Sequence, residues 1–297
     1  MMIGLVRCLA LCGFVAATPA AASQSGPASD DQSTIVVEGN RNADQDMKEF
    51  VRALTPTPPG GKLSRFEQQV CPRAVGLPQI QGEALAKRIR RVAREVGIAV
   101  GGANCVPNLL VMITRDKKIL LEELQRRYSP YFGDLSSKEI KRLARHPGPA
   151  VSWHLQGTPI SAQGTEAIYD SALQAYVNRT TGAASRINAT GRRQFDGAVV
   201  VVERQSLEGV TVTQLADYAA LRALVGSDPA RLATSAPPTI LRLLDAPAGS
   251  AVPLSLTEWD LGFLRGFYSA PRNISTSAQR SAIGRSVAQE VKSSKNE

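Results

Sequence analysis

The stretch over residues 197–226 places an apolar strand shortly before an apolar helix. Residues 198–202 are one alanine and four valines, a run that predicts a strand buried on both faces. Thr211 stands three residues before Gln214, which is the spacing of a helix-starting capping box, and Gly226 supplies the stop. Apolar residues cover nearly the whole circumference between these ends, so we expect this helix to lie in the core.

Strands and helices alternate along the preceding part of the chain. The spacing of apolar residues predicts helices over 81–96, 117–128, 137–145 and 166–177, and strands over 108–114 and 150–155. A further segment, 185–189, can pair with 198–202 as a hairpin. This order predicts an α+β fold with a mixed sheet and a central buried helix.

Composition divides the chain into four parts. Residues 1–22 have a positive start, a short apolar run and the small residues Ala20, Ala21 and Ala22, which is typical of a secretory signal peptide. Residues 23–61 form an N-terminal extension that ends in a Pro/Gly linker. The main domain is expected over 62–272 and a weakly ordered tail over 273–297.

The signal peptide predicts a periplasmic or secreted protein, cleaved near Ala22. No later apolar run reaches the roughly 18 residues of a membrane span, so we expect no transmembrane segment. Cleavage would leave Cys71 and Cys105, and two cysteines in an oxidising compartment predict one disulfide bond. Two buried free thiols are the alternative.

The segment around the central helix resembles the active-site helix of metzincin-type, zincin-like metallopeptidases. On their pattern H-E-x-x-H-x-x-G-x-x-H, the three metal-ligand positions fall on Gln214, Tyr218 and Leu224, and the general base falls on Leu215. An amide, a phenol and an alkyl chain do not replace three imidazoles around zinc. The resemblance therefore implies a degenerate metallopeptidase domain, and we expect neither a metal nor another cofactor.

The likeness continues toward the C-terminus. Residues 239–241 stand where that family has its methionine-containing turn, with Leu241 in place of methionine. Residues 256–260, followed by Leu264 and Tyr268, resemble the closing helix of the family, except that Phe267 replaces a leucine. The chain as a whole also resembles an uncharacterised family of exported bacterial proteins, which implies no activity.

Few residues offer catalytic chemistry. The chain has two histidines, His146 and His154, and it lacks a G-x-S-x-G nucleophile motif. The catalytic candidates are Asp217, Tyr218 and His154. Asp217 is among them because a carboxylate in an apolar setting can act as an acid or base. The alternative for Asp217 is a structural pair with Arg222 or exposure to solvent.

A basic helix face offers a second kind of site. The formal net charge is +9, and the helix over 81–96 contributes five cations that are candidates for anion binding. They are Lys87, Arg88, Arg90, Arg91 and Arg94. No aromatic residues are interleaved with them, so nucleic-acid binding is not supported. An anionic envelope surface is the partner that this face suggests, and a solvated helix face is the alternative.

The sequence thus favours a non-catalytic exported protein that binds an unknown envelope protein or peptide. The alternative is a metal-independent hydrolase with a site around Asp217 and Tyr218. The peptide would add to an edge strand over 185–189, which contains Arg186 and Ile187, unless that edge is covered by the 157–163 loop or the N-terminal extension. Arg186, Arg192 and Arg193 would favour an acidic ligand.

Export gives the first testable expectation. Because signal peptidase cuts after small residues, the mature protein should begin near Ser23. Intact-mass measurement of the exported protein checks this expectation. A soluble cytosolic form that retains Met1 would contradict it.

Overall fold

The computed structural model describes residues 38–55, 63–161, 164–177, 191–247, 250–271 and 274–294. Its contacts divide the chain into two units, Met1–Val37 and Glu38–Glu297, and all the described residues belong to the second. In these ranges, no helix has the length and apolar character needed to cross a membrane.

The elements alternate in an α+β order. The α-helices are α1 (Glu38–Leu54), α2 (Gln79–Glu95), α3 (Lys117–Arg127), α4 (Ser137–Ala144), α5 (Val212–Val225), α6 (Glu258–Ser269) and α7 (Thr276–Ser294). The strands are β1 (Pro72–Val75), β2 (Leu109–Thr114), β3 (Ala150–Gln156), β4 (Ile160–Ser161), β5 (Ile168–Asp170), β6 (Ala175–Val177), β7 (Gly191–Arg192) and β8 (Phe195–Glu203). Short 3₁₀ turns are η1 (Ser129–Phe132), η2 (Arg204–Leu207), η3 (Pro229–Arg231) and η4 (Ile240–Arg242).

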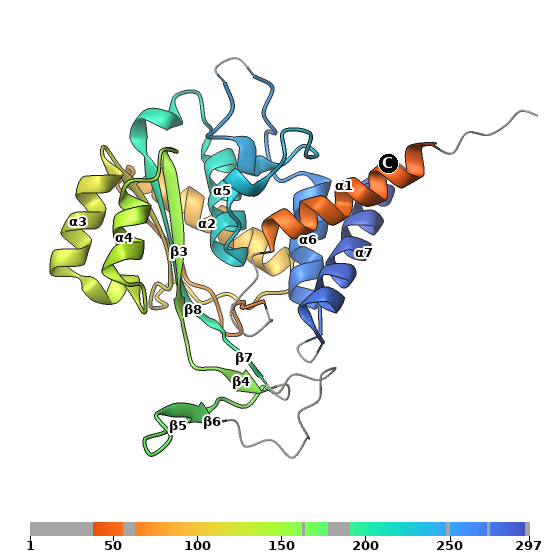
Figure 1. Ribbon diagram of the computed structural model, residues 1–297. Helices are drawn as coiled ribbons and strands as arrows, with labels where there is room; N and C mark the ends of the chain where they lie inside the picture. The colour runs from red at the N-terminus through yellow and green to blue at the C-terminus, as the bar shows by residue number, and fades with distance from the viewer. Residues whose placement is uncertain are drawn as a thin grey trace, which may run out of the picture. The chain divides into compact units, whose positions relative to one another are not determined.

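The main sheet has the strand order β1-β2-β8-β3. β1, β2 and β8 are parallel. β3 runs antiparallel to β8 and lies at one edge of the sheet, and Figure 1 labels both of these strands. The predicted α+β fold with a mixed sheet is therefore confirmed.

β8 is the strand that both hydrophobic cores share. Ala198, Val200 and Val202 face the core that contains α2 and α5, whereas Val199 and Val201 face the core formed with α3, α4 and η1. This alternation follows from the period of two along a strand. The prediction of a strand buried on both faces is confirmed.

The central helix α5 begins and ends as the sequence predicts. Thr211 and Gln214 make both hydrogen bonds of the capping box, and Gly226 caps the other end with a left-handed φ of 68°. Every residue from Gln214 to Val225 is buried. Ser136 and Glu139 form a second capping box, which starts α4.

The predicted disulfide bond joins Cys71 and Cys105, whose Cα atoms lie 6.0 Å apart. It links the start of β1 to the segment that precedes β2. Asn108 supports the same junction, because its Oδ1 accepts from the Cys71 N–H at 2.7 Å and its Nδ2 donates to the Gln69 carbonyl at 3.0 Å.

The prediction of a helix over 166–177 is wrong, since β5 and β6 form a hairpin there. Its larger apolar side chains are exposed, from 49% for Tyr176 to 68% for Leu173. Their spacing along the chain therefore does not reflect a helix face that packs against the core. The Asp170 carboxylate accepts from the N–H groups of Ala172 and Leu173, which fixes a turn. The rings of Tyr169 and Tyr176 pair across the strands at 5.3 Å.

The predicted pairing of 185–189 with 198–202 is also wrong. Each edge of a strand takes one neighbour, and the two edges of β8 are occupied by β2 and β3. Residues 185–189 themselves lie outside the described residues.

The two ends of the main unit differ from the expected boundaries. α1 belongs to this unit, and the buried Phe50 ring packs edge-on against Trp259 and Phe263. Where we expected a weakly ordered tail, α7 is a 19-residue helix that packs against α6. Gly262 and Gly266 make this packing close, because a Cβ on either would lie 2.7 Å from a Cα atom of α7. Glycine has no apolar side chain, so the spacing of apolar residues in the sequence gave no sign of this helix contact.

We therefore expect Gly266→Ala to lower the free energy of unfolding by about 1–3 kcal/mol, since its Cβ would overlap the backbone at Ile283. Gly284→Ala is the matched control on α7, where the nearest atom is the Met47 sulfur at 3.4 Å. The control should be neutral or stabilise by up to about 1 kcal/mol through helix propensity. Urea denaturation measures both, and equal effects would contradict this packing.

Candidate functional site

Asp217 is fully buried on α5 and is bound on both carboxylate oxygens. Arg88 donates from Nε to Oδ1 at 2.7 Å and from Nη2 to Oδ2 at 2.8 Å. The Ser255 hydroxyl and the Leu256 N–H also donate to Oδ2. Asp217 therefore joins α2, α5 and the segment before α6. The alternative that it pairs with Arg222 or reaches solvent is wrong, since its ion-pair partner is Arg88.

This ion pair removes Arg88 from the cations of α2 that could bind an external anion. The pKa of Arg88 is raised, and the largest cause is its hydrogen bond to Asp217. Arg88 is thus committed inside the fold, and Arg90 points its Nη2 toward the Pro72 carbonyl at 3.5 Å. Lys87, Arg91 and Arg94 remain exposed on this face. Anion binding by α2 stays a prediction that rests on these three cations.

The positions that match metal ligands have other roles. The Gln214 side chain closes the capping box and donates to the Pro253 carbonyl at 2.9 Å. Tyr218 accepts a hydrogen bond from Arg222, burial raises the pKa of its phenol, and Leu224 is fully buried in the core. Across the described ranges, no three His, Cys, Asp or Glu side chains are grouped so that they could hold a metal ion.

The two C-terminal motif segments meet beside α5. The fully buried Asp260 of α6 accepts from the Thr239 hydroxyl at 2.6 Å and from the Ile240 N–H at 2.9 Å. The Thr257 N–H donates to the same carboxylate. Burial raises the pKa of Asp260 to about 6, although these hydrogen bonds act in the opposite direction.

His154 lies on β3 and has a structural environment. Its Nε2 is 2.7 Å from the Ala223 carbonyl, which can only accept, so Nε2 carries the proton. Its ring stacks on Phe195, and burial lowers its pKa to about 4. His154 is therefore neutral at pH 7. The other histidine, His146, has Nδ1 as acceptor for the Gly148 N–H.

Arg222 is the functional candidate that sequence reasoning missed. It is 7% exposed, yet its hydrogen bonds go to two hydroxyls, those of Ser152 on β3 and Tyr218 on α5. Within the described residues, no carboxylate lies within 4 Å of its guanidinium. Buried cations are rarely left without an anion, although the C-terminal end of α5 compensates part of the charge. The visible signal was the single cation in a helix whose other residues are mostly apolar.

β3 has a free hydrogen-bonding edge in the described part of the chain. The Glu203 N–H donates to the Pro149 carbonyl at 2.9 Å, and alternate residues of an antiparallel strand bond to the same neighbour. Residues 151, 153 and 155 therefore turn their peptide groups toward β8. Those of Ser152 and His154 point away from it, and β8 is the one strand paired with β3.

The arginines that were expected to attract an acidic ligand are engaged elsewhere. Arg192 is buried and pairs with Glu67, and Arg193 pairs with Asp134 at 3.4 Å. Arg186 and Ile187 lie outside the described residues. Among the described strands, the free edge of the sheet beside the cation Arg222 is thus that of β3.

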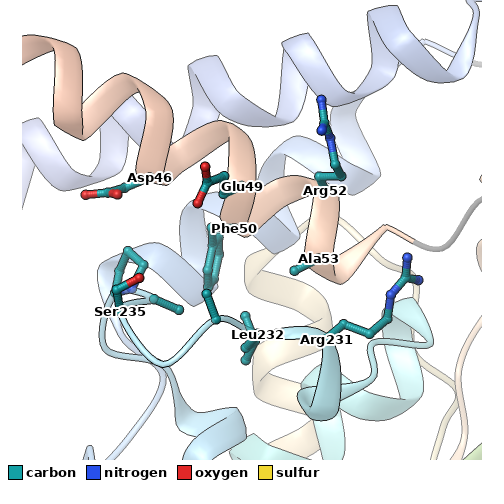
Figure 2. A pocket seen from close by; sticks show the side chains of 11 residues that line it. Asp46, Glu49, Phe50, Arg52, Ala53, Arg231, Leu232 and Ser235 are labelled. Carbon is teal, nitrogen blue, oxygen red and sulfur yellow. The ribbon is translucent and has the colours of Figure 1, made fainter.

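A hollow of about 280 Å³ lies between α1 and the segment that follows η3 (Figure 2). Its charged groups are the acids Asp46 and Glu49 together with the cations Arg52 and Arg231. This mixture of acids and cations offers no cluster of carboxylates such as a metal ion requires.

Comparisons with protein-family models, with curated proteins and with solved structures gave no match to this chain.

The buried ion pair allows a direct test of the role of Asp217. Asp217→Ala should lower the free energy of unfolding by about 3–5 kcal/mol, because it leaves the Arg88 charge without its partner. Arg88→Ala should have an effect of the same order, and the double variant should lose less than the sum of the two.

Glu122→Ala is the control for that experiment, since it breaks the exposed pair with Lys118 and should change stability by less than about 1 kcal/mol. Urea denaturation of the four variants measures these effects. A change below about 1 kcal/mol for Asp217→Ala would contradict the structural role and favour the catalytic alternative.

Proposed function

We propose that this chain is an exported, non-catalytic binding protein that accepts an extended peptide along the free edge of β3. The observation that carries the proposal is the outward direction of the Ser152 and His154 peptide groups. Unpaired edges accept a further strand through backbone hydrogen bonds, and neighbouring side chains then select its sequence.

Arg222 gives this edge a preference for acidic side chains. Ser152 and His154 turn their side chains to the α5 side of the sheet, where they contact Arg222 and Ala223. A carboxylate on the added strand would supply the anion that Arg222 lacks in the described part of the chain. Arg–carboxylate hydrogen bonds are among the stronger ones in proteins, since both partners are charged.

A degenerate zincin-like fold is part of the proposal. The support is that edge strand β3 precedes β8 in the chain and lies beside it, and that β8 leads to the buried helix α5. In zincin-like peptidases, the substrate lies along an edge strand placed in this way. The contact of Asp260 with Thr239 and Ile240 adds support, because it joins the two segments that resemble the family's turn and closing helix.

A periplasmic or secreted location is also part of the proposal. The disulfide bond is consistent with an oxidising compartment. The hydrolase alternative would need a reactive group at Asp217 or Tyr218. The fourfold hydrogen bonding of Asp217 and the raised pKa of Tyr218 favour the binding function instead.

Ser152→Pro tests the edge directly, because proline removes one outward N–H while the hydrogen bonds from β3 to β8 remain. The matched control is Ser152→Ala, which also loses the hydroxyl but keeps the N–H. The probe is a fluorescent peptide of alternating Thr and Val with one central Glu, measured by anisotropy. We expect Ser152→Pro to weaken binding by about tenfold or more relative to Ser152→Ala.

A second peptide, with Lys in place of Glu, tests the preference for an acid. Arg222→Met should abolish the difference between the two peptides. Equal binding by Ser152→Pro and Ser152→Ala, with unchanged circular dichroism, would exclude edge addition.

A further inference from the structure

Four cations form one stripe on the outward face of α4, which we call the α4 stripe. Lys138, Lys141, Arg142 and Arg145 stand at i, i+3, i+4 and i+7, a spacing that places them on one helix face. All four are exposed. The opposite face is fixed against the sheet, because Ile140 and Ala144 belong to the core with Val151, Trp153, Val199 and Val201.

Helix stability does not account for the whole stripe. Cations in the last turn of a helix complement its dipole, but Lys138 lies in the first turn, where the dipole disfavours a positive charge. The acid within α4, Glu139, accepts from the Ser136 N–H and hydroxyl at 2.8 and 2.6 Å. These bonds, and in smaller part Arg142, lower the pKa of Glu139. In the ranges that the structure describes, no member of the stripe has an acid within 4 Å.

A hollow of about 200 Å³ lies between α3 and α4 beside the stripe. Lys118, Lys141 and Arg145 line it, together with Gln125 and one acid, Glu122. Glu122 is 3.9 Å from Lys118, so it offsets one of the three cations and leaves net positive charge. The volume is below the roughly 300 Å³ at which sites for whole small ligands begin, and it suits a single phosphate group.

Two exposed tyrosines lie at one end of this surface. Tyr128 caps α3 and Tyr131 belongs to η1, and their rings are 6.3 Å apart. Tyr128 is 55% exposed and Tyr131 is 40% exposed. The Gln125 amide, one turn before Tyr128, donates to the Ser137 hydroxyl at 3.2 Å, which places this end of α3 beside the start of α4. Tyrosine suits the boundary between lipid and water, because its ring is apolar and its hydroxyl is polar.

We propose that the surface formed by α3, η1 and α4 docks on an anionic phospholipid membrane. A headgroup phosphate occupies the hollow, the α4 stripe faces the charged surface, and the two tyrosines lie at the level of the headgroups. Cations close to a membrane surface strengthen binding to anionic lipids, and this attraction decays over about one Debye length. A nucleic acid fits less well, because it needs a positive groove that follows many phosphates. The stripe spans one helix of eight residues, about 12 Å.

The test is co-sedimentation of the full chain with vesicles of phosphatidylcholine, with and without phosphatidylglycerol. The test variant carries Lys138→Gln, Lys141→Gln, Arg142→Gln and Arg145→Gln. The charge-matched control carries Lys48→Gln, Arg73→Gln, Arg285→Gln and Lys292→Gln, four exposed cations on α1, β1 and α7. We expect the test variant to lose on the order of 100-fold in binding to the anionic vesicles at low salt, and the control to retain most of it.

Two more arms separate lipid from other anions. Tyr128→Ser with Tyr131→Ser should weaken vesicle binding but leave binding to inorganic phosphate unchanged. An equal loss in the test variant and the control would overturn the proposal, because net charge alone would then explain binding. Absence of vesicle binding, or stripe-dependent binding to duplex DNA without vesicle binding, would overturn it as well. Circular dichroism of each variant confirms that the fold is intact.

Discussion

Burial of β8 on both faces is the constraint on which the rest of this structure depends. Burying a valine side chain contributes about 1.5–3 kcal/mol, and β8 supplies such side chains alternately to two cores. A strand of this kind must lie inside a sheet, since its neighbours have to satisfy its peptide groups in the absence of water. β2 and β3 take those places, which leaves β3 at the edge. The free edge that β3 has among the described strands is thus a consequence of the apolar run.

The buried helix α5 shows how charged groups inside a core are used for architecture. Asp217 and Arg88 bind each other through two hydrogen bonds. Removing one partner would leave the other charge unpaired inside the fold. Asp260 has the same function at the turn before α6. Arg222 differs, because its partners among the described residues are two hydroxyls, and hydroxyls do not neutralise a guanidinium. This unbalanced charge is what makes the β3 edge selective in our proposal.

The sequence could predict what local pattern determines. The valine run, the capping box of α5 and the cysteine pair each specify their structure through near neighbours or composition, and all are confirmed. Contacts between distant segments were not visible. The Arg88–Asp217 pair joins residues 129 positions apart, and the packing of α7 depends on two glycines that leave no apolar signal. The hairpin over β5 and β6 was mistaken for a helix because its strands have only three residues each, too few to show a period of two.

The two proposed surfaces lie on different faces of the sheet. Ser152 and His154 turn toward α5, whereas Val151 and Trp153 turn toward the core that α4 covers. A peptide along β3 and a membrane against α4 would therefore approach through separate side chains. Trp153 connects them physically, because it packs in the α4 core and its Nε1 donates to the Tyr131 carbonyl at 2.7 Å. The strand that accepts the peptide and the turn that would meet the membrane thus share Trp153 as a direct contact.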